Sequence, residues 1–416
     1  MAAAVPDQPA AVPGPAAPPG VSPEQLRTRA RDYIAREKFN RRFTLPATDS
    51  HDELTVTYAV AGKDRDSAPT ILFIGGLYGG RFLATMADYI SEKRGLRFVV
   101  ADRPGMGGST PVEPSQRLAV WLETVPALMR VLGAQHVVLG AHSCGVIYAL
   151  NTVYSMPWIL SPSDPRLYLF APWVSPNHSG ISYLSISSYM PSKVIGSFDS
   201  VVRFVASKIV PTVQFSSGIS TAVSAPFAAS SGHSGGTEGQ NTRVSKHLRD
   251  DLCHEFRGVS AAEATAQSEV VMKALFSEDT SGANHESLLL LKKSVAGPWG
   301  ACESYEDYPG KLDAKLREYF HGRQHSDVGA PVIPQAPQRL TLKVFWAETD
   351  LLIGKKGSAY FDACFKKFIL EELGSGADNS VLLYESETIS KTSHDTVIFP
   401  QYGALPEMIE DILRAK

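Results

Sequence analysis

The 416-residue chain has few cysteines, no excess of one charge and no long apolar run. Its four cysteines are widely spaced and form no C-x-x-C pair, so they predict neither a disulfide framework nor a zinc site. The 40 basic and 43 acidic side chains nearly balance, which gives no electrostatic reason to expect nucleic acid or an anionic membrane as a partner. Apolar runs stay below the roughly 18 residues that a membrane span requires, so we expect no integral membrane segment.

The first 23 residues are mostly Ala, Pro, Val and Gly, and they hold seven of the 28 prolines. This proline density opposes both helix and sheet, so we expect a disordered leader. The leader has neither a basic start nor an unbroken apolar stretch, which argues against a secretory signal. A cytoplasmic, reducing location is therefore expected, with the Arg-rich helix that follows leaving an organellar address as the alternative.

Apolar residues make up 44% of the chain and charged residues 20%, as in globular proteins. An antiparallel hairpin is expected over 42–45 and 54–60. Short apolar runs then alternate with helical patterns, which predicts strands buried on both faces of a mainly parallel sheet. These runs lie at 70–74, 97–101, 136–140 and 167–170, and the pattern resumes at 340–345 and 380–384.

Between residues 174 and 338 the alternation of strands and helices stops. Helical segments at 244–256, 261–275 and 285–293 are expected there, beside a Ser- and Gly-rich stretch that favours loops. We therefore predict an α/β fold with a doubly wound, mostly parallel sheet in two parts, 24–174 and 339–416. A helical and irregular cap, 175–338, is inserted after the sixth strand.

One short motif carries the chemistry. Gly140-Ala141-His142-Ser143-Cys144-Gly145 follows a predicted strand and precedes a predicted helix. Small residues at its two ends allow strand and helix to approach closely, while Ser143 is exposed in a strained turn. The motif resembles the nucleophile elbow of the α/β-hydrolase superfamily, with Ala141 in a position that is usually Gly. The resemblance implies Ser143 as the nucleophile, and the plainer alternative is a helix N-cap.

Two further segments fit this resemblance. Residues 102–109 are similar to the family's D-x-x-G-x-G-x-S turn, which implies a structural role for Asp102 and Ser109. The Gly75-Gly76-Leu77 segment stands where the family has its oxyanion turn, with Gly75 in place of the usual His. The resemblance then implies the backbone N–H groups of Leu77 and Cys144 as the donors to an oxyanion.

The family order places the acid and then the base after the nucleophile. Asp350 follows the strand predicted at 340–345 and matches the acid, with Glu348 as the alternative. His394 is the histidine at the place of the base, in a loop expected about ten residues after the last strand. The interval of 44 positions between Asp350 and His394 contains a surface excursion expected at 366–379.

This triad implies a serine hydrolase that cleaves an ester, thioester or related acyl bond through an acyl-enzyme. A serine nucleophile disfavours epoxide opening and halide displacement, which need a carboxylate. Apolar, aromatic stretches in the expected cap suggest a medium-sized apolar small molecule as the substrate, with no metal or organic cofactor. The chain is also similar to stand-alone hydrolases of fungal secondary metabolism. The alternative is a catalytically silent binding or receptor protein of the same fold, and the oligomeric state is not indicated.

Overall fold

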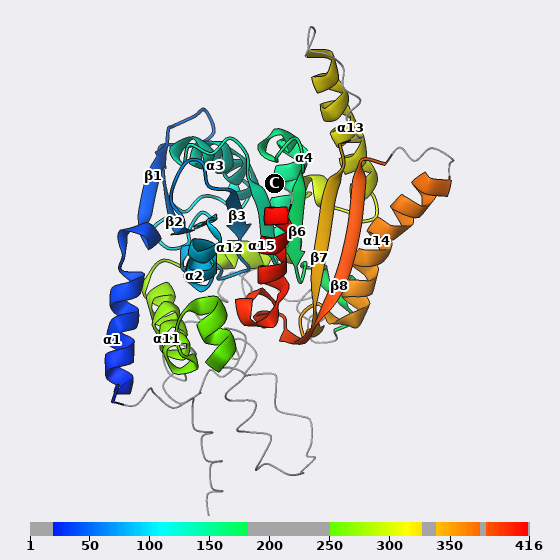
Figure 1. The fold of residues 1–416 in the computed structure, drawn as a ribbon. Coiled ribbons are helices and arrows are strands. Elements are labelled where there is room, and N and C mark those ends of the chain that lie inside the picture. Colours follow the sequence, from blue (N-terminus) through cyan, green and yellow to red (C-terminus); the bar gives the residue numbers. More distant parts are fainter. Residues whose placement is uncertain (1–19, 182–249, 327–337, 375–379, 415–416) are drawn as a thin grey trace, which may run out of the picture.

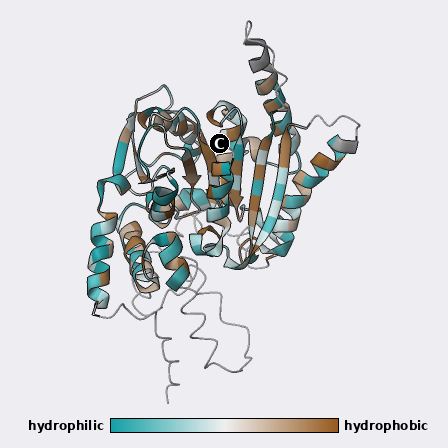
Figure 2. Cartoon of the chain, viewed as in Figure 1, coloured by the Kyte–Doolittle hydropathy of each residue, from teal (hydrophilic) through white to brown (hydrophobic). Residues whose placement is uncertain are grey.

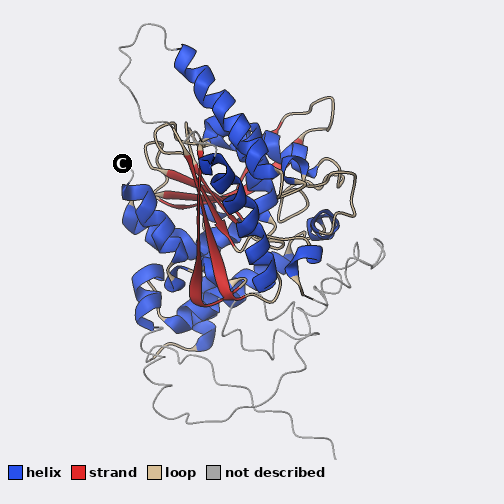
Figure 3. Ribbon diagram, turned by 90° about the vertical axis from the view of Figure 1, so that its right-hand side faces the viewer, coloured by secondary structure: helices blue, strands red, loops and turns tan. Residues whose placement is uncertain are grey.

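The computed structural model describes residues 20–181, 250–326, 338–374 and 380–414. The predicted leader, except for its last four residues, lies outside this part of the chain, as do the apolar cap segments at 183–190 and 209–215. A single eight-stranded sheet runs through the described part, with helices on both of its faces (Figure 1 and Figure 3). The predicted α/β class is confirmed by this arrangement.

The strands lie in the order β1-β2-β4-β3-β5-β6-β7-β8. The pairs β1–β2 and β2–β4 are antiparallel, and every later pair is parallel. The predicted early hairpin and the parallel character of the rest are therefore both confirmed. The strands are β1 (Arg41–Leu45), β2 (Leu54–Gly62), β3 (Thr70–Ile74), β4 (Arg97–Ala101), β5 (Val138–His142), β6 (Arg166–Phe170), β7 (Leu340–Thr349) and β8 (Leu382–Ser393).

Helices connect the parallel strands and also fill the described part of the inserted segment. The first begins with a capping box between Ser22 and Gln25 and ends at Ile34. The described part of the expected surface excursion, 366–374, is helical, because α14 continues to Gly374. The helices are α1 (Pro23–Ile34), α2 (Ala84–Arg94), α3 (Arg117–Val131), α4 (Gly145–Ser155), α5 (Pro176–Ser179), α11 (Ala261–Ser277), α12 (Gly282–Leu290), α13 (Tyr308–Ser326), α14 (Gly354–Gly374) and α15 (Ala404–Arg414).

Alternate residues of the central strands point to two separate cores, as the pleat of a strand requires. Leu72 and Leu139 face a core shared with α3, α4, α13 and α14. Phe73 and Val100 face the other, shared with α2 and α15. Figure 2 shows hydrophobic residues on these central strands and hydrophilic ones on outlying helices such as α1. Burial on both faces explains why these strands are continuous apolar runs in the sequence.

The described helices of the inserted segment pack against the sheet domain. Trp299, Tyr305 and Tyr308 are buried in the same core cluster as α3 and α4, and α11 lies beside α1 (Figure 1). The division that assigns 175–338 to a separate cap stays a prediction, since much of that segment lies outside the described residues. Among the helices that are described, none has the length and apolarity to span a membrane.

Candidate active site

Ser143 occupies a tight turn between β5 and α4. The strand ends at His142, two residues later than expected, and the helix begins at Gly145. Ser143 has a φ of 53°, a left-handed conformation that costs a non-glycine residue about 1–2 kcal/mol. A Cβ atom at Gly145 would lie 2.3 Å from the carbonyl oxygen of Ile74. Glycine is therefore required where the helix passes the neighbouring strand, as the small-residue argument predicted.

Ser143, His394 and Asp350 form one hydrogen-bonded chain. The Ser143 Oγ lies 2.8 Å from His394 Nε2, and His394 Nδ1 lies 2.8 Å from Asp350 Oδ2. Each residue directly follows the carboxyl end of a parallel strand: β5, β8 and β7, respectively. The expectation of a ten-residue loop before His394 is wrong, because β8 continues to Ser393. This longer strand delivers the imidazole to the sheet edge where Ser143 lies.

The alternative acid, Glu348, lies on the solvent side of the same strand end. It is exposed, and its carboxylate accepts the backbone N–H of Lys391 at 2.7 Å. Asp350 instead uses one oxygen for His394 and the other for the N–H groups of Leu352 and Ile353, each at 2.8 Å. The structure thus brings Asp350, and not Glu348, into contact with the imidazole.

Burial and charge have opposite effects on the pKa of each residue of the His394–Asp350 pair. Burial disfavours the charged imidazole, but the Asp350 carboxylate more than compensates and raises the pKa of His394 above its usual value. Burial likewise opposes ionisation of Asp350, yet His394 and two backbone N–H donors hold the pKa of this carboxyl below its usual range. Asp350 is thus a carboxylate that favours a proton on His394 Nδ1, which leaves Nε2 as the acceptor for the Ser143 hydroxyl.

A second histidine, His142, contacts the backbone of His394. His142 is buried, and its Nε2 lies 2.8 Å from the backbone oxygen of His394, so this nitrogen is the donor. Burial, with a smaller contribution from His394, lowers the pKa of His142 to about 3 and keeps its ring neutral. The sequence places His142 inside the elbow motif but gives no sign of this contact, because its partner lies 252 residues away.

The Gly75–Gly80 turn lies over Ser143. A Cβ atom at Gly76 would come within 3.3 Å of the Ser143 Cβ and 3.0 Å of His142 Nδ1, so a larger residue would crowd both side chains. Within the described residues, the backbone N–H groups of Leu77 and Cys144 donate no hydrogen bond to another residue. Cys144 directly follows Ser143, and Leu77 directly follows Gly76, which lies beside Ser143.

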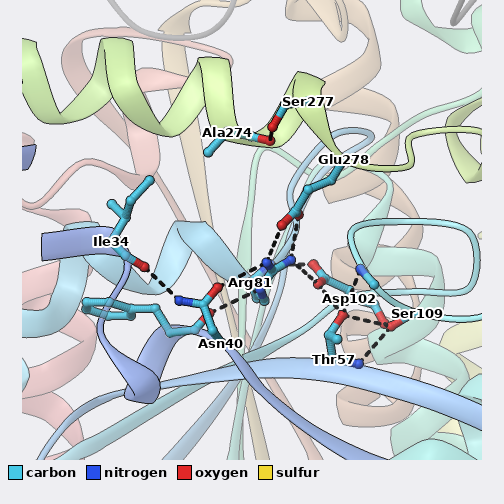
Figure 4. A network of polar contacts seen from close by, with 11 residues as sticks. Ile34, Asn40, Thr57, Arg81, Asp102, Ser109, Ala274, Ser277 and Glu278 are labelled. Carbon is cyan, nitrogen blue, oxygen red and sulfur yellow. Dashed lines mark hydrogen bonds and ion pairs between the residues drawn. The ribbon is translucent and has the colours of Figure 1, made fainter. Parts of the chain in front are cut away.

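Asp102 and Ser109 form part of a structural network, as the resemblance implied. Asp102 accepts the backbone N–H of Arg81 at 2.6 Å, its Nη1 at 2.9 Å and the Thr57 hydroxyl at 2.6 Å. Arg81 also pairs with Glu278 at the end of α11 (Figure 4). These contacts fix the turn after β3 to the turn after β4, and neither Asp102 nor Ser109 touches the Ser143–His394–Asp350 chain.

One group of side chains has the composition of a metal site. Ligand atoms of His142, His394 and Asp395 all lie within 4.8 Å of one another. Both ring nitrogens of His394 already contact Ser143 and Asp350, and Nε2 of His142 is bound to a carbonyl oxygen. A metal ion here would have to displace hydrogen bonds of the chain described above, so these residues fit a proton-transfer site better than a metal site.

The strand order, the antiparallel second strand and the serine turn after β5 define the α/β-hydrolase fold. The three predicted site residues, Ser143, Asp350 and His394, directly follow the ends of β5, β7 and β8. No protein-family model and no curated protein sequence matches the chain.

Several solved structures are similar over most of their length. A carboxylesterase of Nitrososphaera gargenis is 11% identical, with a TM-score of 0.45 over 89% of this chain and 96% of its own. A thioesterase domain from the curacin biosynthetic pathway is 12% identical, with a TM-score of 0.45 over 89% and 99%. An epoxide hydrolase of Vigna radiata is 13% identical, with a TM-score of 0.46 over 91% and 99%. Because these identities and TM-scores are low, the fold is assigned from the strand order of this chain and from its serine turn after β5.

Proposed function

We propose that the protein is a serine hydrolase that cleaves an acyl bond through Ser143, His394 and Asp350. The observation that carries the proposal is the continuous chain of two 2.8 Å hydrogen bonds from Asp350 through His394 to Ser143. The strained φ of 53° at Ser143, supported by close packing at Gly145, adds the geometry of a nucleophile at the start of a helix.

In the proposed reaction, His394 Nε2 takes the Ser143 proton while Oγ attacks the acyl carbonyl carbon. The imidazolium then gives that proton to the leaving oxygen or sulfur, and the bond to the leaving group breaks. Water repeats the sequence on the acyl-enzyme and releases the acid. Asp350 holds the imidazole in the tautomer that can accept from Ser143, and its charge stabilises the transient imidazolium.

The tetrahedral intermediate needs donors for its negative oxygen. The backbone N–H groups of Leu77 and Cys144 are proposed for this role, because they flank Ser143 and bind no other described residue. Cys144 precedes the first turn of α4, where the helix dipole adds positive potential. Donors of this kind contribute about 10²–10³-fold each in rate.

The residue at the elbow also sets the reaction class. Epoxide opening and halide displacement require a carboxylate that forms an alkyl ester, whereas Ser143 forms an acyl ester. We therefore propose an ester, a thioester or a related acyl bond as the target, and a medium-sized apolar small molecule as the substrate. The substrate proposal rests on the apolar composition of the inserted segment.

The proposal is tested by covalent labelling with a fluorophosphonate probe. Wild-type protein should be labelled in a 1:1 ratio, and Ser143→Ala should not be labelled at all. Ser91→Ala is the matched control, because Ser91 is a fully buried serine on α2 outside the site, and its labelling should be unchanged. Equal labelling of Ser143→Ala would contradict the proposal. A panel of p-nitrophenyl esters and acyl thioesters of increasing chain length then measures the substrate preference.

A further inference from the structure

A buried arginine lies against the turn that carries Leu77. Arg103 follows Asp102 and is 2% exposed. Its Nη1 donates to the carbonyl oxygen of Gly75 at 2.7 Å, and its Nη2 donates to that of Gly76 at 2.6 Å. One planar guanidinium group therefore binds two consecutive carbonyl groups of the turn, a geometry that the fork of arginine provides and a lysine ammonium does not.

These two contacts determine where the next N–H group points. In a trans peptide the C=O and N–H bonds point in opposite directions, and the described chain contains no cis peptide bond. Because the Gly76 carbonyl points toward Arg103, the Leu77 N–H of the same peptide group points away from it. Gly76 also lies within contact of Ser143. Arg103 thus fixes the peptide group that is proposed to bind the oxyanion.

The guanidinium group is itself held by a carboxylate from the inserted segment. Glu286, on α12, accepts Arg103 Nε at 2.8 Å, Arg117 Nη2 at 2.6 Å and the Tyr148 hydroxyl at 2.9 Å, all on Oε1. Burial opposes its ionisation, but the two guanidinium groups lower the pKa of Glu286 to about 2. We call Arg103, Arg117, Tyr148 and Glu286 the arginine cluster. It places a charged residue of the inserted segment directly behind the oxyanion turn.

We propose that Arg103 is a positioning residue for the oxyanion turn and that Glu286 holds its guanidinium group in the orientation this requires. This inference rests on the proposed function, since it concerns the same reaction. Through Glu286, the inserted segment would then help to position the oxyanion turn, in addition to any contact that it makes with the substrate.

Arg117 offers a matched control within the cluster. It is as buried as Arg103 and binds the same oxygen of Glu286, but its other contacts are the carbonyl of Pro104 and the hydroxyl of Tyr148, and not the turn. A lysine at either position keeps one positive charge and loses the planar fork. Arg103→Lys and Arg117→Lys should therefore lower the melting temperature to a similar extent. Only the first should affect the oxyanion turn.

The first measurement is steady-state hydrolysis of a p-nitrophenyl ester. We expect kcat of Arg103→Lys to fall about 10²-fold with KM within about threefold of wild type, as for the loss of an oxyanion donor. Arg117→Lys should keep kcat within about threefold. Equal losses of kcat in the two variants would overturn the proposal, because both would then report only a damaged core.

A second measurement does not depend on catalysis. The Gly79 N–H donates to the Gly76 carbonyl at 2.8 Å, the same oxygen that Arg103 binds. Hydrogen exchange at Gly79 should be about tenfold faster in Arg103→Lys than in Arg117→Lys, and unchanged exchange would overturn the positioning role. If wild-type protein were not labelled at Ser143, the proposed function would fail, while this exchange comparison would still decide whether Arg103 orders the turn.

Arg103→Gln covers the case in which the lysine variant does not fold. This change leaves Glu286 paired with Arg117, so it creates no uncompensated buried carboxylate. The same loss of kcat and the same faster exchange at Gly79 are expected. Wild-type values of both in folded Arg103→Gln would contradict the proposal.

Discussion

The Ser143–His394–Asp350 chain and the arginine cluster both lie beside the oxyanion turn, and they are built in different ways. The three residues of the chain each follow the end of a parallel strand, so the sheet alone brings them to one edge. The arginine cluster joins the turn after β4, helices α3 and α4, and α12 from the inserted segment. The comparison suggests that the sheet supplies the reacting groups, while helices inserted between its strands hold the backbone around them.

His394→Gln is the sharpest test of the role proposed for the Ser143–His394–Asp350 chain. Without the imidazole no group can take the Ser143 proton, so kcat/KM for p-nitrophenyl esters should fall about 10⁴-fold while the melting temperature changes little. His51→Gln is the control, because His51 Nε2 also contacts a carboxylate, that of Glu123 at 2.9 Å, far from the site in sequence and in contacts. Retained activity in His394→Gln would remove His394 from the mechanism.

The acid is tested by comparing Asp350→Asn with Glu348→Gln. The asparagine should lower kcat about 10³- to 10⁴-fold, because it no longer stabilises the imidazolium and can favour the wrong tautomer. The Glu348 carboxylate accepts the backbone N–H of Lys391 and does not contact His394, so Glu348→Gln should keep kcat within about twofold. The reverse order of effects would show that Glu348 is the acid and that the contacts of Asp350 are structural.

The Ser143–His394–Asp350 chain was more predictable from the sequence than the arginine cluster. Ser143, Asp350 and His394 could be named because the elbow motif resembles that of the α/β-hydrolase superfamily, and the family's order places the acid and then the base after later strands. The length of β8 could not, since its exposed alternating residues give a weaker signal than the buried runs. Arg103 was visible only as part of a turn motif. Glu286 carried no signal at all, because a carboxylate on an amphipathic helix is ordinarily solvated, and its partners lie 183 and 169 residues away.

The charge of the His394–Asp350 pair should be visible in pH dependence. Activity needs neutral His394, so kcat/KM should fall as the pH drops through the pKa of His394. Because Asp350 raises that pKa, the acid limb should lie above the value of about 6.5 that is usual for histidine. In Asp350→Asn the cause of the increase is gone while burial remains, so NMR titration should place the His394 pKa below that of wild type. An unchanged pKa would show that Asp350 does not set the charge of the imidazole.

The smallest effect is expected at a different contact between the sheet domain and the inserted segment. Arg81 binds Glu278 of the inserted segment as well as Asp102, but its described contacts do not reach the carbonyl groups of Gly75 and Gly76 (Figure 4). Glu278→Gln should therefore lower the free energy of unfolding by about 1.5–3 kcal/mol, the range for a hydrogen bond to a charged group. Urea denaturation measures this change. Because Arg81 keeps its buried partner Asp102, kcat should stay within about twofold of wild type. A loss of kcat as large as that of Arg103→Lys would mean that Arg81 and Glu278, and not only Arg103 and Glu286, position the oxyanion turn.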